Sequence, residues 1–97
     1  MDVPRFLASL DDASPPSGVS PLLTALWHER RGDWRRAHEI AQDVDDADGA
    51  WVHAYLHRRE GDQGNAAYWY RHAGRPVMRG DLDDEWRAIV EALLLSW

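Results

Sequence analysis

The sequence feature that most constrains this fold is a Gly-Asp pair that occurs twice, as Gly32-Asp33 and as Gly61-Asp62, 29 positions later. Shifting the sequence by this interval brings further identical residues into register. Ala25, His28, Arg30 and Ala37 fall on Ala54, His57, Arg59 and Ala66. Self-similarity at a fixed interval is typical of stacked supersecondary units. The sequence therefore predicts two copies of one structural unit.

Each unit is predicted to be a hairpin of two helices joined at its Gly-Asp pair. A glycine can adopt the left-handed conformation that ends a helix, and the aspartate after it can cap the next helix. So short a joint makes the two helices antiparallel neighbours. Each helix also carries an apolar face at helical spacing. These faces comprise Leu22, Leu23, Ala25, Leu26, Trp34, Ala37, Ile40, Ala41 and Val44 in the first unit, and Trp51, Val52, Ala54, Tyr55, Leu56, Ala66, Trp69, Tyr70 and Ala73 in the second.

Shorter segments flank the two units. Residues 3–10 fit a short amphipathic helix, and the Pro-, Ser- and Gly-rich stretch 11–20 is typical of a linker. Ser20 before Pro21 is a strong helix start, and the acidic run 81–85 favours the start of a last helix. We predict one all-α domain, with an N-terminal helix and linker over 1–20, hairpins over 21–47 and 48–76, and a capping helix over 81–97. The apolar positions of the capping helix are Trp86, Ile89, Val90, Leu93, Leu94 and Trp97.

Charge and composition limit the classes of partner and location. The formal net charge of −6 argues against nucleic acid as a main partner. No apolar run approaches the roughly 18 residues that span a membrane, and the first 20 residues lack the pattern of a signal peptide. The chain has no cysteine, which is compatible with the cytoplasm. We expect a cytoplasmic protein without nucleic-acid or membrane partners. Its central arginines form either solvated helix faces or a face for an acidic or phosphorylated partner.

The second unit also carries a family resemblance. Its stretch EGDQGNAAYWYRHAG resembles tetratricopeptide-type repeats, which have Gly-Asp at the hairpin and then small, aromatic and alanine positions, here Ala66, Tyr70 and Ala73. The ending WYRHAG is similar to SEL-type repeats. The longer stretch GAWVHAYLHRREGDQGNAAYWYRHAGRP is similar to a group of small uncharacterised bacterial and fungal proteins. The resemblance covers about 22–76 and implies a helical-repeat fold that binds a peptide or protein in a groove. It departs from the family in its period, 29 rather than about 34, and in its histidines at positions 53 and 57.

Two histidines and a glutamate have the spacing of metal ligands. His53, His57 and Glu60 lie at positions i, i+4 and i+7 of one predicted helix, on its polar face. Two histidines at this spacing can bind one metal ion, with a carboxylate as a third ligand. His28, equivalent to His57 in the first unit, could lie nearby. The alternative is a structural or groove-lining role. Because the order His-Glu-x-x-His of zinc hydrolases is missing, the sequence assigns no metal or other cofactor.

Polar residues of the second unit that lack a counterpart in the first define the candidate binding surface. His53, Glu60, Asn65 and Tyr68 are aligned with Thr24, Arg31, Arg36 and Glu39, so repetition does not explain them. His57 and the flanking Arg58 complete this surface. Tyr68 either lines a groove or packs on the last helix. The favoured function is a non-catalytic module that binds a protein, a peptide or a second copy of the chain. The alternative is a metal-binding protein or small metal-dependent enzyme that uses His53, His57 and Glu60.

Overall fold

The computed structural model describes residues 1–95, and all regular structure in this range is helical, which confirms the all-α class. The helices are α1 (Val3–Ala8), α2 (Pro21–Arg30), α3 (Trp34–Gln42), α4 (Ala47–Arg59), α5 (Gln63–His72) and α6 (Leu82–Leu95), with a 3-10 turn at Ser9–Asp11. Trp97, the last apolar position predicted for the C-terminal helix, lies outside the described residues. Within residues 1–95, no helix is long and apolar enough to cross a membrane.

The two Gly-Asp pairs form matching joints, as the sequence predicts. Gly32 and Gly61 both have φ of +90°, the left-handed region that ends a helix without steric cost only at glycine. Asp33 accepts a hydrogen bond from the backbone N–H of Arg36, and Asp62 accepts one from that of Asn65. The two glycines thus end α2 and α4, and the aspartates cap α3 and α5.

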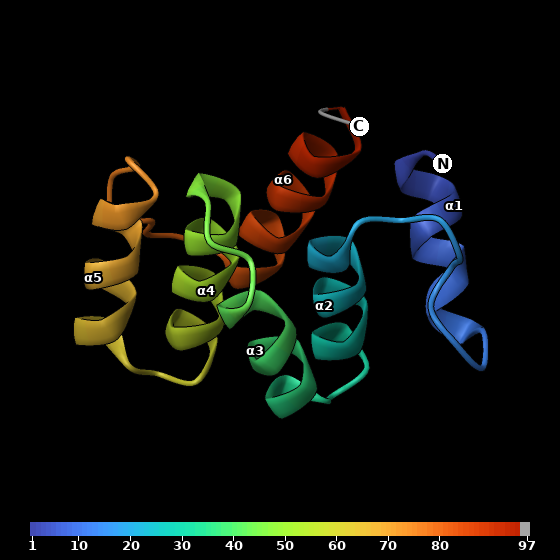
Figure 1. The fold of residues 1–97 in the computed structure, drawn as a ribbon, viewed down its shortest axis with the longest axis horizontal. Coiled ribbons are helices and arrows are strands. Elements are labelled where there is room, and N and C mark those ends of the chain that lie inside the picture. The colour runs from blue at the N-terminus through green and yellow to red at the C-terminus, as the bar shows by residue number, and fades with distance from the viewer. Residues whose placement is uncertain (96–97) are drawn as a thin grey trace.

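The helices pack around α4. α4 contacts α5, α3, α6 and α2, while α2 also contacts α3 and α6. In Figure 1, α1 lies at one side of the molecule and α5 at the other, with α2 and α4 between them. α6 packs across both α2 and α4 and also contacts α1. The last helix thus lies against the first helix and against two central ones.

Because α4 is central, the face that the sequence predicts to be polar and groove-facing is buried. Every residue from Gly49 to Leu56 is buried, including His53, whose exposed fraction is only 6%. The helical spacing of apolar residues placed His53 on a polar, groove-facing side. That side is instead covered, because α3 and α5 pack against α4 there. His53 is therefore a buried polar residue that needs a partner inside the protein.

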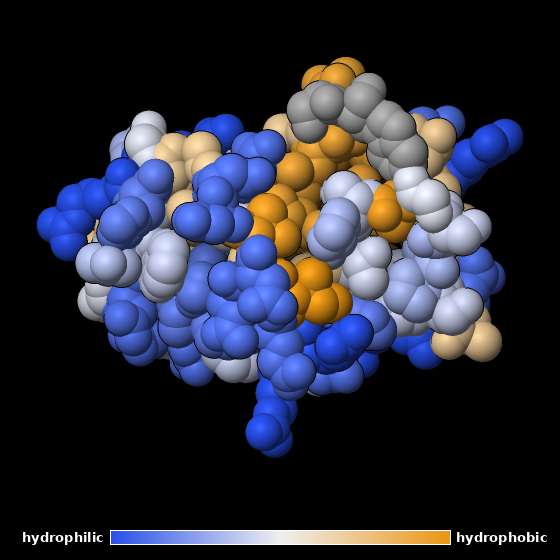
Figure 2. Space-filling view, in the orientation of Figure 1, coloured by the Kyte–Doolittle hydropathy of each residue, from blue (hydrophilic) through white to orange (hydrophobic). Residues whose placement is uncertain are grey.

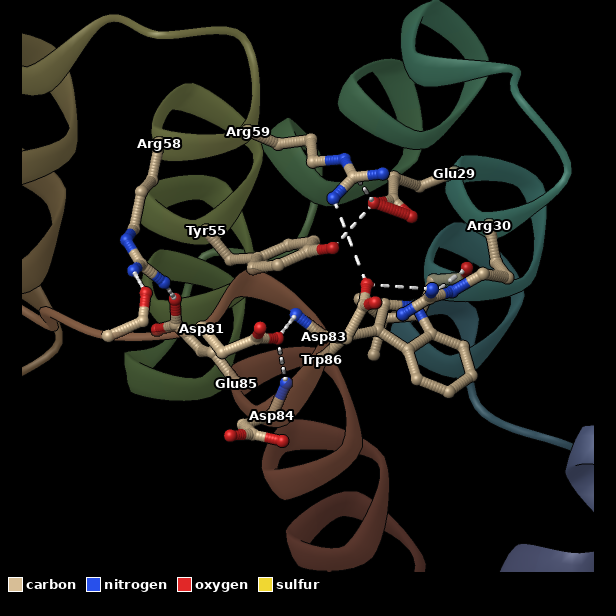
Figure 3. A network of polar contacts seen from close by, with 12 residues as sticks. Glu29, Arg30, Tyr55, Arg58, Arg59, Asp81, Asp83, Asp84, Glu85 and Trp86 are labelled. Carbon is tan, nitrogen blue, oxygen red and sulfur yellow. Dashed lines mark hydrogen bonds and ion pairs between the residues drawn. The ribbon is translucent and has the colours of Figure 1, made fainter.

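A buried carboxylate of α6 holds one end of this helix against α4. Glu85 is 2% exposed and accepts hydrogen bonds from Arg58 Nη1 at 2.8 Å, Trp51 Nε1 at 3.2 Å and Tyr70 Oη at 2.5 Å. Arg58 also donates to the carbonyl oxygen of Gly80, just before α6 (Figure 3). Burial, together with the hydrogen bond to Glu85, raises the pKa of Tyr70 well above its usual value. Tyr70 therefore stays a neutral donor at any physiological pH.

A second polar group joins α2, α4 and α6. Tyr55 Oη donates to Glu29 at 2.5 Å, and Arg59 Nε lies 3.6 Å from the same carboxylate. Asp83 accepts from Arg30 Nη1 at 2.9 Å and lies 3.8 Å from Arg59 Nη1. Figure 3 shows these side chains converging between the three helices. Removing one member of such a set leaves a desolvated partner, which costs more than the intact pair contributes.

We predict that Glu85→Gln lowers the free energy of unfolding by about 3–5 kcal/mol, because it leaves the buried Arg58 guanidinium without a counter-charge. Urea unfolding followed by circular dichroism measures this loss. The matched control is Asp84→Asn, an exposed neutralisation one position earlier, which changes stability by less than about 1 kcal/mol. Equal losses for the two variants would contradict a special role for Glu85.

A second prediction concerns Gly49, which permits a close approach of backbone segments. A Cβ atom at this position would overlap the carbonyl oxygen of Val44 and would lie 2.9 Å from its carbonyl carbon. We expect Gly49→Ala to destabilise the protein by about 1–3 kcal/mol, because the turn before α4 must move. Gly64→Ala is the control, since its Cβ would meet only Asp62 Oδ1, at 3.9 Å. Thermal unfolding should show no loss for Gly64→Ala, and a similar loss for both would refute the steric explanation.

Candidate functional site

The most concentrated group of reactive side chains is a cluster of three histidines where α3 meets α4. His38 comes from α3, and His53 and His57 come from α4, one turn apart. His38 Nε2 and His53 Nε2 are 2.9 Å apart. One ring nitrogen from each residue lies within 4.8 Å of the other two. The three rings therefore converge on one point, which is the arrangement that a metal ion requires.

Two tryptophans hold the histidine rings in place. Trp69 of α5 stacks on His53 with ring centroids 4.0 Å apart and an interplanar angle of 11°. Trp34 of α3 stacks on His38 at 4.9 Å and 12°. Trp34 is itself fixed, because its Nε1 donates to the carbonyl oxygen of Leu56 at 2.7 Å. Packing of this kind limits the rotamers available to the cluster.

Glu60 orients the third histidine. Its Oε2 lies 2.7 Å from His57 Nδ1, and because a carboxylate only accepts, Nδ1 is the donor. This contact leaves His57 Nε2 unprotonated in the neutral ring, so that nitrogen can act as an acceptor or ligand. The side chain of His57 is 12% exposed and that of Glu60 is 39% exposed. Glu60 thus closes the outer side of the cluster toward solvent.

The environment keeps the buried ring uncharged. Burial, together with the neighbouring His38 and His57, lowers the pKa of His53 to about 4. Burial also lowers the pKa of His38, as does the nearby His57. The contact between the two Nε2 atoms needs one donor and one acceptor, so it exists only while at least one ring is neutral. At neutral pH His53 and His38 are therefore uncharged.

A cleft adjoins the cluster between the end of α3 and α5. Its volume is about 470 Å³, within the usual range for ligand pockets. The start of α4 lines it through Gly49, Ala50 and His53, and α5 lines it through Trp69 and His72. The remaining side is formed by the end of α3, the α3–α4 connection and the first residue of α4: Ala41, Gln42, Val44, Asp45, Asp46 and Ala47. The cleft thus combines aromatic rings with carboxylates.

A second, more apolar hollow lies beside this cleft. Its volume is about 430 Å³, and its apolar lining includes Val19, Leu22, Val44 and Leu93. In Figure 2 an apolar band runs between α2 and α4 and along α6, whereas hydrophilic residues cover α5. The hollow and the cleft share Val44 and one carboxylate, Asp46. The short α3–α4 connection therefore separates a polar cleft from an apolar hollow.

The residues proposed from the sequence do not form one surface. His53 and His57 belong to the histidine cluster, and Glu60 is bonded to its outer side. Arg58 is 9% exposed and engaged with Glu85, in the network that holds α6. Neither metal-type cluster found among residues 1–95 includes His28, whose ring instead contacts Trp27.

The other two proposed residues lie on α5. Asn65 completes the N-terminal cap of α5, where its Nδ2 donates to Asp62 Oδ2 at 2.7 Å. Tyr68 is 46% exposed, and its ring contacts Trp69 and His72. Tyr68 therefore packs on its own helix and presents its outer side to solvent.

His38 is the member of the cluster that sequence reasoning missed. It lies in the first unit, whereas the search for unrepeated polar residues considered only the second. The same comparison in the other direction would have found it, because His38 is aligned with Ala67 in the 29-residue register. Trp69 and His72 were likewise missed as site residues: Trp69 was assigned to the apolar face, although it also lines the cleft.

Comparison with known proteins adds no relative: no family model, curated protein or solved structure matches this chain. The tetratricopeptide-like resemblance accordingly stays a prediction. The cleft and the histidine cluster are the features of the chain that bear on its function.

The lowered pKa of His53 predicts a pH-dependent stability. Between pH 6.5 and about 4 the unfolded chain binds a proton at His53 and the folded chain does not, so stability falls as pH falls through this window. The shift corresponds to roughly 3 kcal/mol. We expect wild type to lose about this much more than His53→Gln between pH 7 and pH 4. Urea unfolding in the presence of a metal chelator tests this difference, and parallel pH profiles would contradict it.

Proposed function

We propose that the chain is a small tetratricopeptide-like module that binds a protein or peptide partner and has no catalytic role. In this proposal α2 with α3 and α4 with α5 are two stacked antiparallel hairpins, and α6 is the capping helix. The matching geometry at Gly32 and Gly61, and the pairing of helices in contact, support this arrangement. The observation that carries the function is the cleft of about 470 Å³ between α3 and α5.

The position of α6 supports placing the partner in the cleft between α3 and α5. α6 packs across α2 and α4 and is fixed there through Glu85 and Asp83. That side of the first helices is therefore filled by the chain itself. The cleft lies on another side, where α3, α4 and α5 leave a hollow lined by His53, Trp69 and His72.

The charge of the cleft indicates the kind of partner. Asp43, Asp45 and Asp46 are exposed, Asp48 is partly buried, and within residues 1–95 no arginine or histidine forms an ion pair with any of them. Two of these carboxylates, Asp45 and Asp46, line the cleft, and the apolar hollow lies next to it. We therefore propose a partner segment that carries basic residues next to apolar ones.

The proposed cellular location and class of partner follow from composition. The net charge of −6 opposes binding to nucleic acid, and the lack of cysteine is compatible with a reducing compartment. We accordingly propose a cytoplasmic role with a protein or peptide as partner. A second copy of the chain is the competing occupant of the cleft.

A charge reversal tests the proposed cleft. We titrate the protein into short fluorescent peptides that carry basic and apolar residues, and follow binding by fluorescence anisotropy. A second set of peptides has glutamate in place of the basic residues. We expect binding of the basic peptides only, weakened at least tenfold in Asp45→Arg, because like charges then meet at the cleft. Asp12→Arg, an equal change of charge at an exposed linker position, should weaken binding less than threefold.

Two results would contradict this proposal. Equal weakening by both reversals would show that the peptides respond only to net charge. Absence of peptide binding together with a dimeric mass in light scattering, lost in Asp45→Arg, would assign the cleft to a second copy of the chain.

A further inference from the structure

We propose that His38, His53 and His57 form a binding site for Zn²⁺ or a related divalent transition metal ion. This inference goes beyond the proposed partner binding and does not rest on it. It rests on three imidazole nitrogens that lie within 4.8 Å of one another, in rings two of which stack on tryptophans. Imidazole nitrogen is a preferred ligand of zinc, nickel, cobalt and copper.

The separations of the donor atoms suit a tetrahedral ion. Zn–N bonds of about 2.0–2.1 Å place ligand nitrogens roughly 3.4 Å apart around a tetrahedral ion. The Nε2 atoms of His38 and His53 are 2.9 Å apart, and all three donors fall within 4.8 Å. These separations lie on either side of the tetrahedral value, so small ring adjustments would bring the donors to metal geometry.

The groups around the cluster hold the rings in an orientation that suits metal binding. Glu60 accepts from His57 Nδ1, which leaves Nε2 as the unprotonated nitrogen of the neutral His57 ring. A carboxylate in this position is the usual outer partner of a histidine ligand, where it fixes the ring and raises its basicity. Trp34 and Trp69 stack on the other two rings. The site is therefore preorganised, and little side-chain entropy remains to be lost on binding.

The role of Glu60 differs from the one that the sequence suggested. The spacing of His53, His57 and Glu60 made Glu60 a direct ligand, but its carboxylate contacts His57 on the Nδ1 side. A second possible set comprises His57, Glu60 and Asp62. In that set both oxygens of Asp62 already accept hydrogen bonds from Asn65 at the start of α5. The three-histidine set gives up only the contact between the Nε2 atoms of His38 and His53 and keeps the Asp62 cap of α5, which favours it.

A three-histidine site has a defined chemical consequence. Three protein ligands leave a fourth position of a tetrahedral ion for water or for a donor group of a bound partner. The ion would also join α3 to α4, and so link the two helix pairs. Metal binding should consequently stabilise the fold.

The test uses full-length protein stripped with a chelator and then titrated with ZnCl₂ in a calorimeter. We expect one Zn²⁺ per chain and a rise in Tm on the order of 10 °C when free zinc exceeds Kd a hundredfold. Replacement by Co²⁺ should give the intense visible absorption of a tetrahedral cobalt centre. His38→Ala should weaken zinc binding at least a hundredfold and abolish the cobalt spectrum.

Two further variants separate ligands from their supports. Glu60→Gln should keep the cobalt spectrum but weaken zinc binding by about 10–100-fold, because it removes only the outer partner of His57. His28→Ala is the matched control, a histidine of the first unit outside the cluster, and it should bind zinc as wild type does. His38→Asn replaces His38→Ala if the alanine variant fails to give the native near-ultraviolet circular dichroism.

Three outcomes would overturn the site. The first is wild-type protein that binds no stoichiometric zinc. The second is zinc binding that survives His38→Ala but is lost in Glu60→Gln, which would move the site to His57, Glu60 and Asp62. The third is equal weakening by His28→Ala, which would show unspecific binding to histidines. None of these outcomes depends on peptide binding, so the site and the proposed function can fail separately.

Discussion

α4 is buried on almost every side. Each polar side chain that is buried with it finds a partner on a neighbouring helix. Arg58 requires a counter-charge, which α6 supplies through Glu85. The hydroxyl of Tyr55 donates to Glu29 of α2. On the opposite side, His53 meets His38 of α3. Because an unpaired buried polar group costs about 1–3 kcal/mol, and a charge more, each contact fixes the position of a different helix relative to α4.

The parts that the sequence predicted correctly are governed by local interactions. Left-handed Gly32 and Gly61, and the caps at Ser20, Asp33 and Asp62, follow from residues within a few positions of each other. The parts it missed depend on contacts between distant segments. Helical spacing identifies an apolar face, but it cannot show that the opposite face of α4 is also covered. The burial of His53 and Arg58, and the approach of His38, arise only when the helices are packed.

Residues that the 29-residue sequence shift aligns can have different polar contacts. The 29-residue shift aligns Glu29 with Arg58. Glu29 accepts from Tyr55, whereas Arg58 reaches across to α6. Residues aligned by the 29-residue shift thus have different partners: Glu29 faces Tyr55 of α4, and Arg58 faces Glu85 of α6. Polar residues without a repeated counterpart, such as His38, are informative because the fold of a single unit does not require them.

His53 connects the two proposals, since it belongs to the histidine cluster and also lines the cleft. An ion that fixes the His53 ring also fixes one side of the cleft, together with the Trp69 ring stacked on it. Coupling between two sites is reciprocal: whatever factor zinc applies to partner affinity, the partner applies to zinc affinity. The coupling acts through one side chain, so its size depends on how far the ring must turn to meet the ion. The stacking of His53 on Trp69 limits that rotation, and the energetic link between the sites should therefore be small but measurable.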